Sequence, residues 1–286
     1  MISNKTKGVF WMLISVLGFT FMSIAIKYLP RIPTYEKVFF RNSVSLMLSA
    51  FILFKQKESI KVEKENIPFV FGRSFFGFVG MVANFYALEY LTMAEANMLN
   101  KLSPVFVTIC ACIFLKERVD KKQVIGIILM LLAVVFVIKP SFSPEIIPSL
   151  AGLSSAVLAG FSYTIIRYLN GKVKSEINVL YFSLLSVVCT FPLMMMNFVK
   201  PTLSEFLILL GGIGISAAIG QFGLTYAYTF APASEVSIYN YVIIITSMLM
   251  DYILFSTIPD LFSFIGGFMI ISTAIYLYIH NKKKDN

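Results

Sequence analysis

The sequence predicts an all-α polytopic membrane protein with ten transmembrane helices, arranged as two inverted five-helix repeats around a central cavity. The chain is 58% hydrophobic and 14% charged, with a mean hydropathy of +0.81, which excludes an ordinary soluble domain. Apolar runs of about 20 residues recur along the chain, and a helix of that length crosses a hydrocarbon core of roughly 30 Å. In addition, the stretch Gly80–Asp120 returns without a gap as Gly220–Asp260.

The apolar runs divide the chain into ten expected spans joined by short connections. The first run, from Val9 to Ile26, follows Lys5 and Lys7 and is too long for the core of a signal peptide. The longest connection is the charged loop that follows Phe54. The expected spans are residues 8–29, 35–54, 67–90, 93–115, 121–139, 150–170, 176–198, 203–230, 233–256 and 260–280.

Lysine and arginine are distributed unevenly between the two sides of this predicted bundle. One side has Lys5, Lys7, Lys55, Lys57, Lys61, Lys64, Lys116, Arg118, Lys121, Lys122, Lys172, Lys174, Lys282, Lys283 and Lys284, whereas the other has Arg31, Lys37, Lys139 and Lys200. The positive-inside rule then places both termini in the cytoplasm. We therefore expect a multi-pass protein of the plasma membrane, and of the inner membrane if the source is bacterial. The net charge of +9 lies in loops beside the lipid bilayer, so it does not indicate a nucleic-acid partner.

The internal duplication defines two predicted units, residues 1–140 with spans one to five and residues 141–286 with spans six to ten. Identical residues recur at a constant offset of 140 positions, which is difficult to explain without a duplicated unit: Gly80 and Gly220, Tyr86–Ala87 and Tyr226–Ala227, Glu95 and Glu235, Asn100 and Asn240, Asp120 and Asp260, Gly126 and Gly266. Because each unit has an odd number of spans, the two copies must lie upside down relative to each other. Inverted repeats are typical of secondary transporters, whose substrate site lies near the midplane between the repeats.

Two strings, ALEYLTMAEANMLNKLSPVF and FLKERVDKKQVIGIILMLLAVVFVI, resemble the EamA-type module of the drug/metabolite transporter superfamily. In that module the fourth span commonly starts with a short Ala-containing turn, carries a central proline and ends in a Leu-x-Glu-x pattern, which Leu115–Arg118 matches. The second copy departs from the pattern, with Ile244 in place of Pro104 and Thr257 in place of Glu117. The resemblance implies two modules across the whole chain and a transport function. It leaves open amino acids, aromatic compounds, vitamins and nucleotide-derived metabolites as substrates.

Polar residues inside the fourth span suggest a cavity. Lys101 lies about eight residues, or roughly 12 Å, from the end of the span. It shares a helix face with Asn97, Asn100, Pro104 and Thr108. Such a stripe is expected to face a cavity rather than lipid; the alternative is a buried lysine paired with an acid. Pro104 removes one helical hydrogen bond and is expected to kink the helix.

Arg41 in the second span and Asp251 in the ninth are expected at a depth similar to that of Lys101. Arg41 could bind a carboxylate or phosphate, or tie neighbouring helices together. We expect Asp251 to neutralise one of the two cations and to leave about one positive charge for an anionic or zwitterionic substrate. Alternatively, Asp251 exchanges a proton and couples transport to the proton gradient, or forms a static ion pair.

The other candidate site residues are amides, aromatic residues and one further arginine. Asn84, Tyr86, Gln221, Asn240 and Tyr241 are expected to line the substrate site together with Arg41, Asn97, Asn100 and Lys101. Arg73 and Pro104 are assigned to gating, although Arg73 could instead snorkel to lipid phosphate. Glu95 and Glu235 are expected to cap helix starts, and Lys27 is expected to snorkel.

Enzymatic and ATP-driven functions have little support in the sequence. Cys110, Cys112 and Cys189 all fall in apolar spans, His280 is the only histidine, and no GxxxxGK[ST] or HExxH motif is present. No cofactor or metal is therefore expected. The predicted function is a secondary active transporter or exchanger, with protons as a candidate coupling ion. It moves a small polar metabolite, anionic or zwitterionic such as an amino acid. The alternatives are a non-transporting receptor or structural membrane protein, and an intramembrane enzyme.

Overall fold

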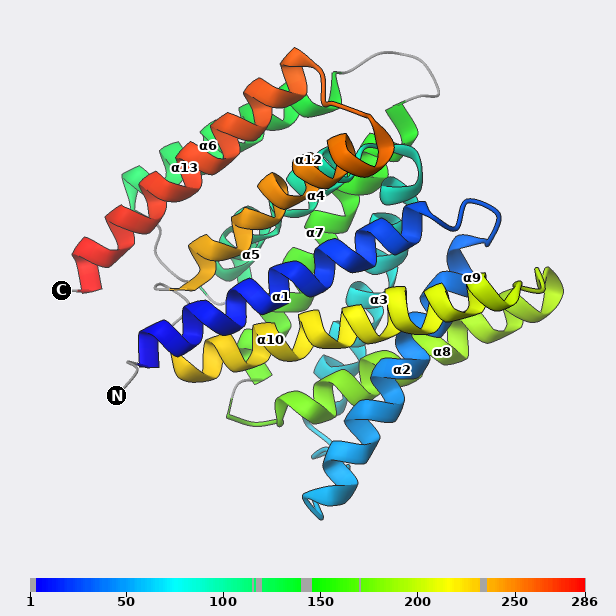
Figure 1. Ribbon diagram of the computed structural model, residues 1–286. Coiled ribbons are helices and arrows are strands. Elements are labelled where there is room, and N and C mark those ends of the chain that lie inside the picture. Colours follow the sequence, from blue (N-terminus) through cyan, green and yellow to red (C-terminus); the bar gives the residue numbers. More distant parts are fainter. Residues whose placement is uncertain are drawn as a thin grey trace.

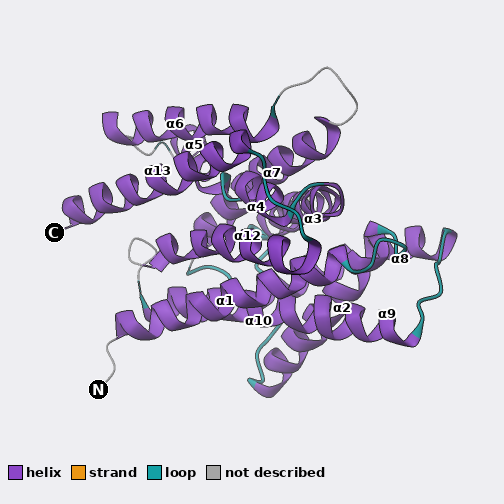
Figure 2. Ribbon diagram, turned by 45° about the horizontal axis from the view of Figure 1, so that its top comes forward, coloured by secondary structure: helices purple, strands orange, loops and turns teal. Residues whose placement is uncertain are grey.

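The computed structural model describes residues 4–114, 116, 120–139, 146–169, 171–231 and 236–285, and every regular element in these ranges is a helix (Figures 1 and 2). Ten segments are long and apolar enough to cross a membrane, which confirms the predicted all-α polytopic class. The helices are α1 (Asn4–Lys27), α2 (Thr34–Lys55), α3 (Ile67–Tyr90), α4 (Met93–Asn100), α5 (Ser103–Phe114), α6 (Lys121–Ile138), α7 (Ile147–Leu169), α8 (Ser175–Met196), α9 (Leu203–Leu207), η2 (Ile208–Ile215), α10 (Ser216–Phe230), η3 (Ser237–Tyr241), α12 (Val242–Phe255) and α13 (Leu261–Asp285).

The most extensive contacts between helices join the first half of the chain to the second half. They are made by α3 with α7, α1 with α10, α2 with α8, α6 with α13 and α5 with α7, and α4 also packs on α12. Figure 1 shows α1 along α10 and α6 along α13. The first span therefore packs on the eighth just as the third packs on the sixth, which is the pattern that a two-fold axis between two five-span units would produce. The division into residues 1–140 and 141–286 stays a prediction.

The fourth span is interrupted in its middle. Helix α4 ends at Asn100, and α5 starts at Ser103, immediately before Pro104. Proline lacks the amide hydrogen that would bond to the carbonyl four residues earlier, so the break lies where the sequence predicts a kink. Lys101 lies in this break and closes the end of α4 by donating its amide to the Asn97 carbonyl at 2.9 Å.

The start of α4 has the capping box that the sequence predicts. The Glu95 amide donates to Thr92 Oγ1 at 3.1 Å, and the Thr92 amide donates to Glu95 Oε2 at 3.3 Å. Glu95 also accepts hydrogen bonds from Lys139 Nζ at 3.1 Å and from Ser263 Oγ at 2.7 Å. Its counterpart, Glu235, lies outside the described residues. Glu95 therefore anchors the helix start to neighbouring elements as well as capping it.

The contact between α1 and α10 includes close approaches of backbone atoms. Ser15 Oγ donates to the Gly220 carbonyl at 2.6 Å. A Cβ added to Gly18 would lie 2.6 Å from the Gly220 nitrogen and 2.7 Å from the Ser216 carbonyl oxygen. These helices approach each other at glycine, as small residues permit in membrane bundles.

Gly18→Ala is expected to lower the stability of the protein by about 1–3 kcal/mol, because the added methyl group overlaps backbone that cannot move aside alone. Gly211→Ala is the matched control, since a Cβ there has no neighbour within 4 Å. Thermal unfolding in detergent measures both variants. Equal melting temperatures for Gly18→Ala and wild type would contradict the close α1–α10 contact.

Candidate functional site

A central cavity of about 180 Å³ lies where the two halves of the chain meet. Its walls come from α1, α2, α3, the fourth span, α7, α8, α10 and the ninth span. Its volume is below the roughly 300–1,000 Å³ of pockets that hold drug-sized ligands, so the cavity suits a small metabolite. The polar residues that line it are Ser23, Arg41, Arg73, Asn84, Asn97, Asn100, Lys101, Ser155, Ser162, Tyr163, Gln221 and Asn240.

Two arginines flank one aromatic ring in the cavity wall. The guanidinium carbon of Arg41 lies 5.5 Å and that of Arg73 4.4 Å from the centre of the Phe182 ring. The two arginines are only 7% and 6% exposed, respectively. Arg41 Nη1 donates to Asn42 Oδ1 at 2.7 Å, but Arg41 Nε and both Nε and Nη1 of Arg73 are buried without a hydrogen-bond partner. Buried donors without acceptors are costly, so this pair is suited to an incoming anion.

Lys101 provides a third positive charge from the break in the fourth span. Its Nζ donates to Asn240 Oδ1 at 3.0 Å. Asn97 and Asn100 line the same cavity and are held by Ser247 Oγ at 2.9 Å and Ser155 Oγ at 3.2 Å, respectively. The predicted polar stripe thus reaches the cavity at these three positions.

Asn84 and Gln221 add amide groups to the wall, as the sequence suggested. Asn84 lies on the face of α3 that also carries Arg73, Gly77 and Gly80, and all four residues line the cavity. Its Oδ1 is buried and has no hydrogen-bond partner. A ligand that brings a donor could satisfy this oxygen. Arg73 is buried at the cavity and does not snorkel.

The expected pairing of Asp251 with Arg41 or Lys101 is wrong. The Asp251 carboxylate is fully buried and accepts hydrogen bonds from the Met93 amide at 3.1 Å and the Ala94 amide at 2.8 Å. Lys27 Nζ lies 4.0 Å from it. The physical reason is the start of α4, whose free amides attract a carboxylate. The expectation that Lys27 snorkels is also wrong. Its side chain is 16% exposed and points to Asp251 and the Phe255 ring.

The cavity consequently has a larger positive excess than expected. Among the described lining residues, Arg41, Arg73 and Lys101 are cationic and none is acidic. In the described part of the chain, no carboxylate lies within ion-pair distance of any of these three side chains. The positive charge left for a ligand therefore comes from three groups rather than from about one.

Besides Asp251, three further predicted site residues lie outside this cavity. Tyr86 stacks on Tyr90 with ring centres 4.7 Å apart, and Tyr241 is buried in the apolar core. Pro104 is exposed and accepts a hydrogen bond from Thr108 Oγ1. The sequence predicted the span that contains each of these residues, but it did not predict which side of the helix faces the cavity. Conversely, sequence reasoning missed Phe182, Ser155 and Ser162, which have no distinguishing signal among many similar residues in apolar spans.

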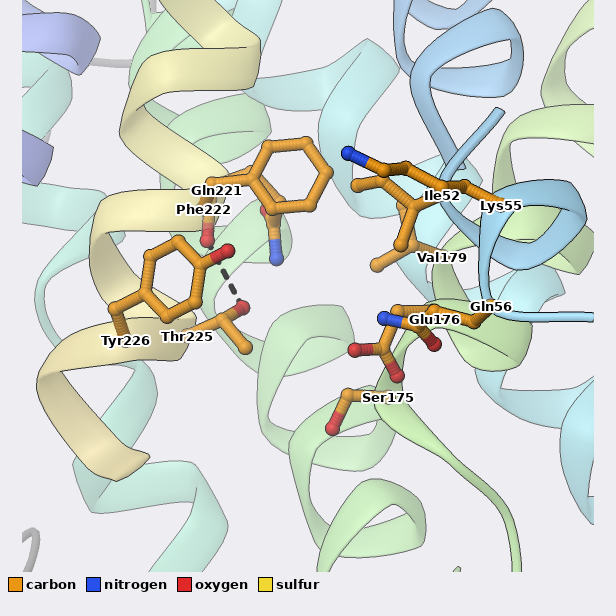
Figure 3. Close-up of a pocket in the computed structure, with 10 residues that line it drawn as sticks. All are labelled: Ile52, Lys55, Gln56, Ser175, Glu176, Val179, Gln221, Phe222, Thr225 and Tyr226. Atoms are coloured by element: carbon orange, nitrogen blue, oxygen red, sulfur yellow. Dashed lines mark hydrogen bonds between the residues drawn. The ribbon is translucent and has the colours of Figure 1, made fainter. Parts of the chain in front are cut away.

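A second, larger cleft of about 420 Å³ adjoins the cavity (Figure 3). It opens at what we call the terminal face, the end of the bundle formed by residues 4–8, 56–66 and 171–174. The end of α2 and the start of α8 form one wall, and α10 forms the other, as Figure 3 shows. Gln221 lines both the cleft and the cavity. The cleft thus extends from the cavity wall toward the terminal face.

Several ion pairs lie at or near the far face, the end of the bundle formed by residues 28–33, 91–92, 139, 197–202 and 256–260. Lys37 Nζ lies 2.7 Å from Glu89 Oε1, Lys139 bridges Glu95 and Asp260, and Arg31 pairs with Glu205. Partial burial lowers the pKa of Lys139, but its hydrogen bonds and ion pairs with Asp260 and Glu95 have the larger combined effect. The pKa of Lys139 is therefore raised. The contact between Asp251 and the start of α4 lies near the same face.

Ten apolar spans in the described part of the chain, with a polar, cation-lined cavity between eight of them, are typical of a multi-pass membrane transport protein. A sequence model of the EamA-like transporter family matches residues 6–139. The first half of the chain thus matches an EamA-type module of the drug/metabolite transporter superfamily, and this match points to a transporter rather than an enzyme.

Proteins of similar sequence are named as transporters. The pseudopaline exporter of Pseudomonas aeruginosa is 29% identical over 273 residues, which cover 94% of this chain and 95% of that protein. The S-adenosylmethionine uptake transporter of Rickettsia conorii is 27% identical, covering 98% of this chain and 95% of that protein. A crystal structure of a protein with 18% identity superposes with a TM-score of 0.68 over 98% of this chain and 99% of the other. That likeness supports the fold alone.

Proposed function

We propose that this transporter is a secondary active transporter or exchanger that moves a small polar metabolite, anionic or zwitterionic such as an amino acid, across the plasma membrane. The observation that carries the proposal is the group of Arg41, Arg73 and Lys101 around one cavity without an acidic lining residue among the described ones. Unpaired cations at membrane depth are costly and are typical of substrate sites. The two relatives are named for opposite directions of transport, so neither direction is carried over.

The two halves are proposed to act as inverted modules, residues 1–140 and 141–286, that rock against each other. The packing of the first span on the eighth and of the third span on the sixth supports this division. With the terminal face in the cytoplasm, as the positive charges of its loops favour, the structure corresponds to an inward-facing state. The cleft then leads from the cytoplasm to the cavity, and the ionic contacts close the outer side.

Reconstitution tests the proposal. Purified protein is screened with metabolites by thermal shift, because a ligand that binds the folded state raises its apparent stability. Each ligand that binds is then assayed for flux into or out of liposomes. Transport of at least one such ligand is expected. Binding without flux for every ligand would favour a receptor, and stabilisation by cations alone would contradict an anionic or zwitterionic substrate.

A further inference from the structure

The cations of the cavity form two separate centres. Arg41 and Arg73 meet at Phe182 of α8, which packs on α2 and α3. Lys101 instead meets Asn240 of the ninth span, where α12 packs on α4 and α1. Asn240 itself lies in η3, at the start of the ninth span. The arginine pair and Lys101 therefore reach one cavity from different helices and have different partners.

Each centre has hydrogen-bond donors that the protein leaves unused. The arginine pair has three buried N–H positions without an acceptor, at Arg41 Nε and at Nε and Nη1 of Arg73. The Lys101 ammonium carries three donors, and the Asn240 oxygen occupies one of them. Burying a cation without a partner costs several kcal/mol, so each centre gains from an anion of its own.

The two centres come from different helices and share no hydrogen-bond or ring partner. We infer that the substrate carries two anionic groups, one at each end, which bind the Arg41–Arg73 pair and Lys101, respectively. Dicarboxylates and acidic amino acids belong to this class. The inference rests on the proposed function, since it assigns a substrate class to the same cavity. Asn84 and Gln221, which also line the cavity, are available to the polar atoms between the two ends.

Matched pairs of ligands that differ by one charge test the inference. The pairs are aspartate and asparagine, glutamate and glutamine, succinate and succinamate, and glutarate and glutaramate. Thermal shift and flux in liposomes are measured for each. In at least one pair, we expect the diacid to bind at least about tenfold more tightly than its monoamide, a difference of about 1.4 kcal/mol. Equal or better binding of the monoamides, or no stabilisation by any diacid at millimolar concentration, would overturn the inference.

Variants connect the charge preference to the two centres. Lys101→Met is expected to remove the tenfold preference for the diacid, because one end of the ligand loses its cation. Lys61→Met is the matched control, since Lys61 is an exposed loop residue. A preference that survives in Lys101→Met would contradict the second centre.

The two claims fail in different ways. Equal transport of a diacid and its monoamide would contradict the two-anion inference but leave the transporter proposal standing. Diacid binding without any flux would leave the ligand class standing and contradict transport.

Discussion

Arg73→Leu is expected to abolish transport and, at the same time, to raise the melting temperature of the ligand-free protein. Arg73 is 6% exposed, and its Nε and Nη1 have no acceptor, so the folded protein holds a buried charge that it does not pair. Removing it should therefore stabilise the fold, because burying a charge without a partner costs several kcal/mol. Removing one partner of a buried charge pair with substrate should cost about 2–5 kcal/mol of binding, or a loss of about thirtyfold to several thousandfold.

The opposite signs of the two effects separate a substrate site from a structural tie. Flux in liposomes and thermal unfolding are measured on the same preparations. Arg167→Leu is the matched control, because Arg167 is an exposed arginine of α7 that does not line the cavity. A lower melting temperature in Arg73→Leu, with transport retained, would make Arg73 a structural residue and contradict its assignment to the site.

Asp251→Asn is expected to open the far face. The carboxylate joins the ninth span to the start of α4 through the Met93 and Ala94 amides, and a neutral amide is a weaker acceptor for both. Hydrogen bonds to charged groups contribute about 1.5–3 kcal/mol each, so the closed state should lose about 2 kcal/mol. A Met81→Cys reporter in the cavity wall, in a protein without its native cysteines, should then react faster with a thiol reagent added at the far face.

Asp120→Asn provides the control for this prediction. Asp120 also caps a helix start, that of α6, but it lies at the terminal face, where it contacts His280. It should leave labelling from the far face unchanged. Equal labelling rates in Asp251→Asn and wild type would show that Asp251 does not hold that face closed.

The same variant tests proton coupling. If Asp251 carries the coupling proton, Asp251→Asn should lose the pH dependence of flux, because an amide does not titrate in this range. Among the described residues, its ion-pair partner is Lys27, at 4.0 Å. Unchanged pH dependence in the variant would remove the proton-carrier hypothesis and leave Asp251 a purely structural contact.

Local rules were sufficient for much of this fold. Hydropathy gave the ten spans, the spacing of Thr92 and Glu95 gave the capping box, and Pro104 gave the break in the fourth span. Helical periodicity also placed Asn97, Asn100 and Lys101 on one face, because that relation depends only on residues within a single helix.

Contacts between distant spans could not be predicted in the same way. Asp251 binds a helix start 157 and 158 positions away, and membrane depth alone did not distinguish this partner from Arg41 or Lys101. Phe182 looked like any apolar span residue until packing placed it between two arginines. The prediction that Tyr86 and Tyr241 line the substrate site was wrong for a related reason. The side of a helix that faces a cavity depends on how the helix packs on its neighbours.

Thiol protection at position 84 tests most directly whether the cation-lined cavity holds the substrate. Asn84 lies in the cavity wall with Arg73, so Asn84→Cys in a protein without its native cysteines reports on the site itself. We predict that an anionic thiol reagent labels the introduced thiol from the terminal face and that a transported ligand slows this labelling in proportion to its occupancy. Labelling that no transported ligand slows would contradict the assignment of the substrate to this cavity.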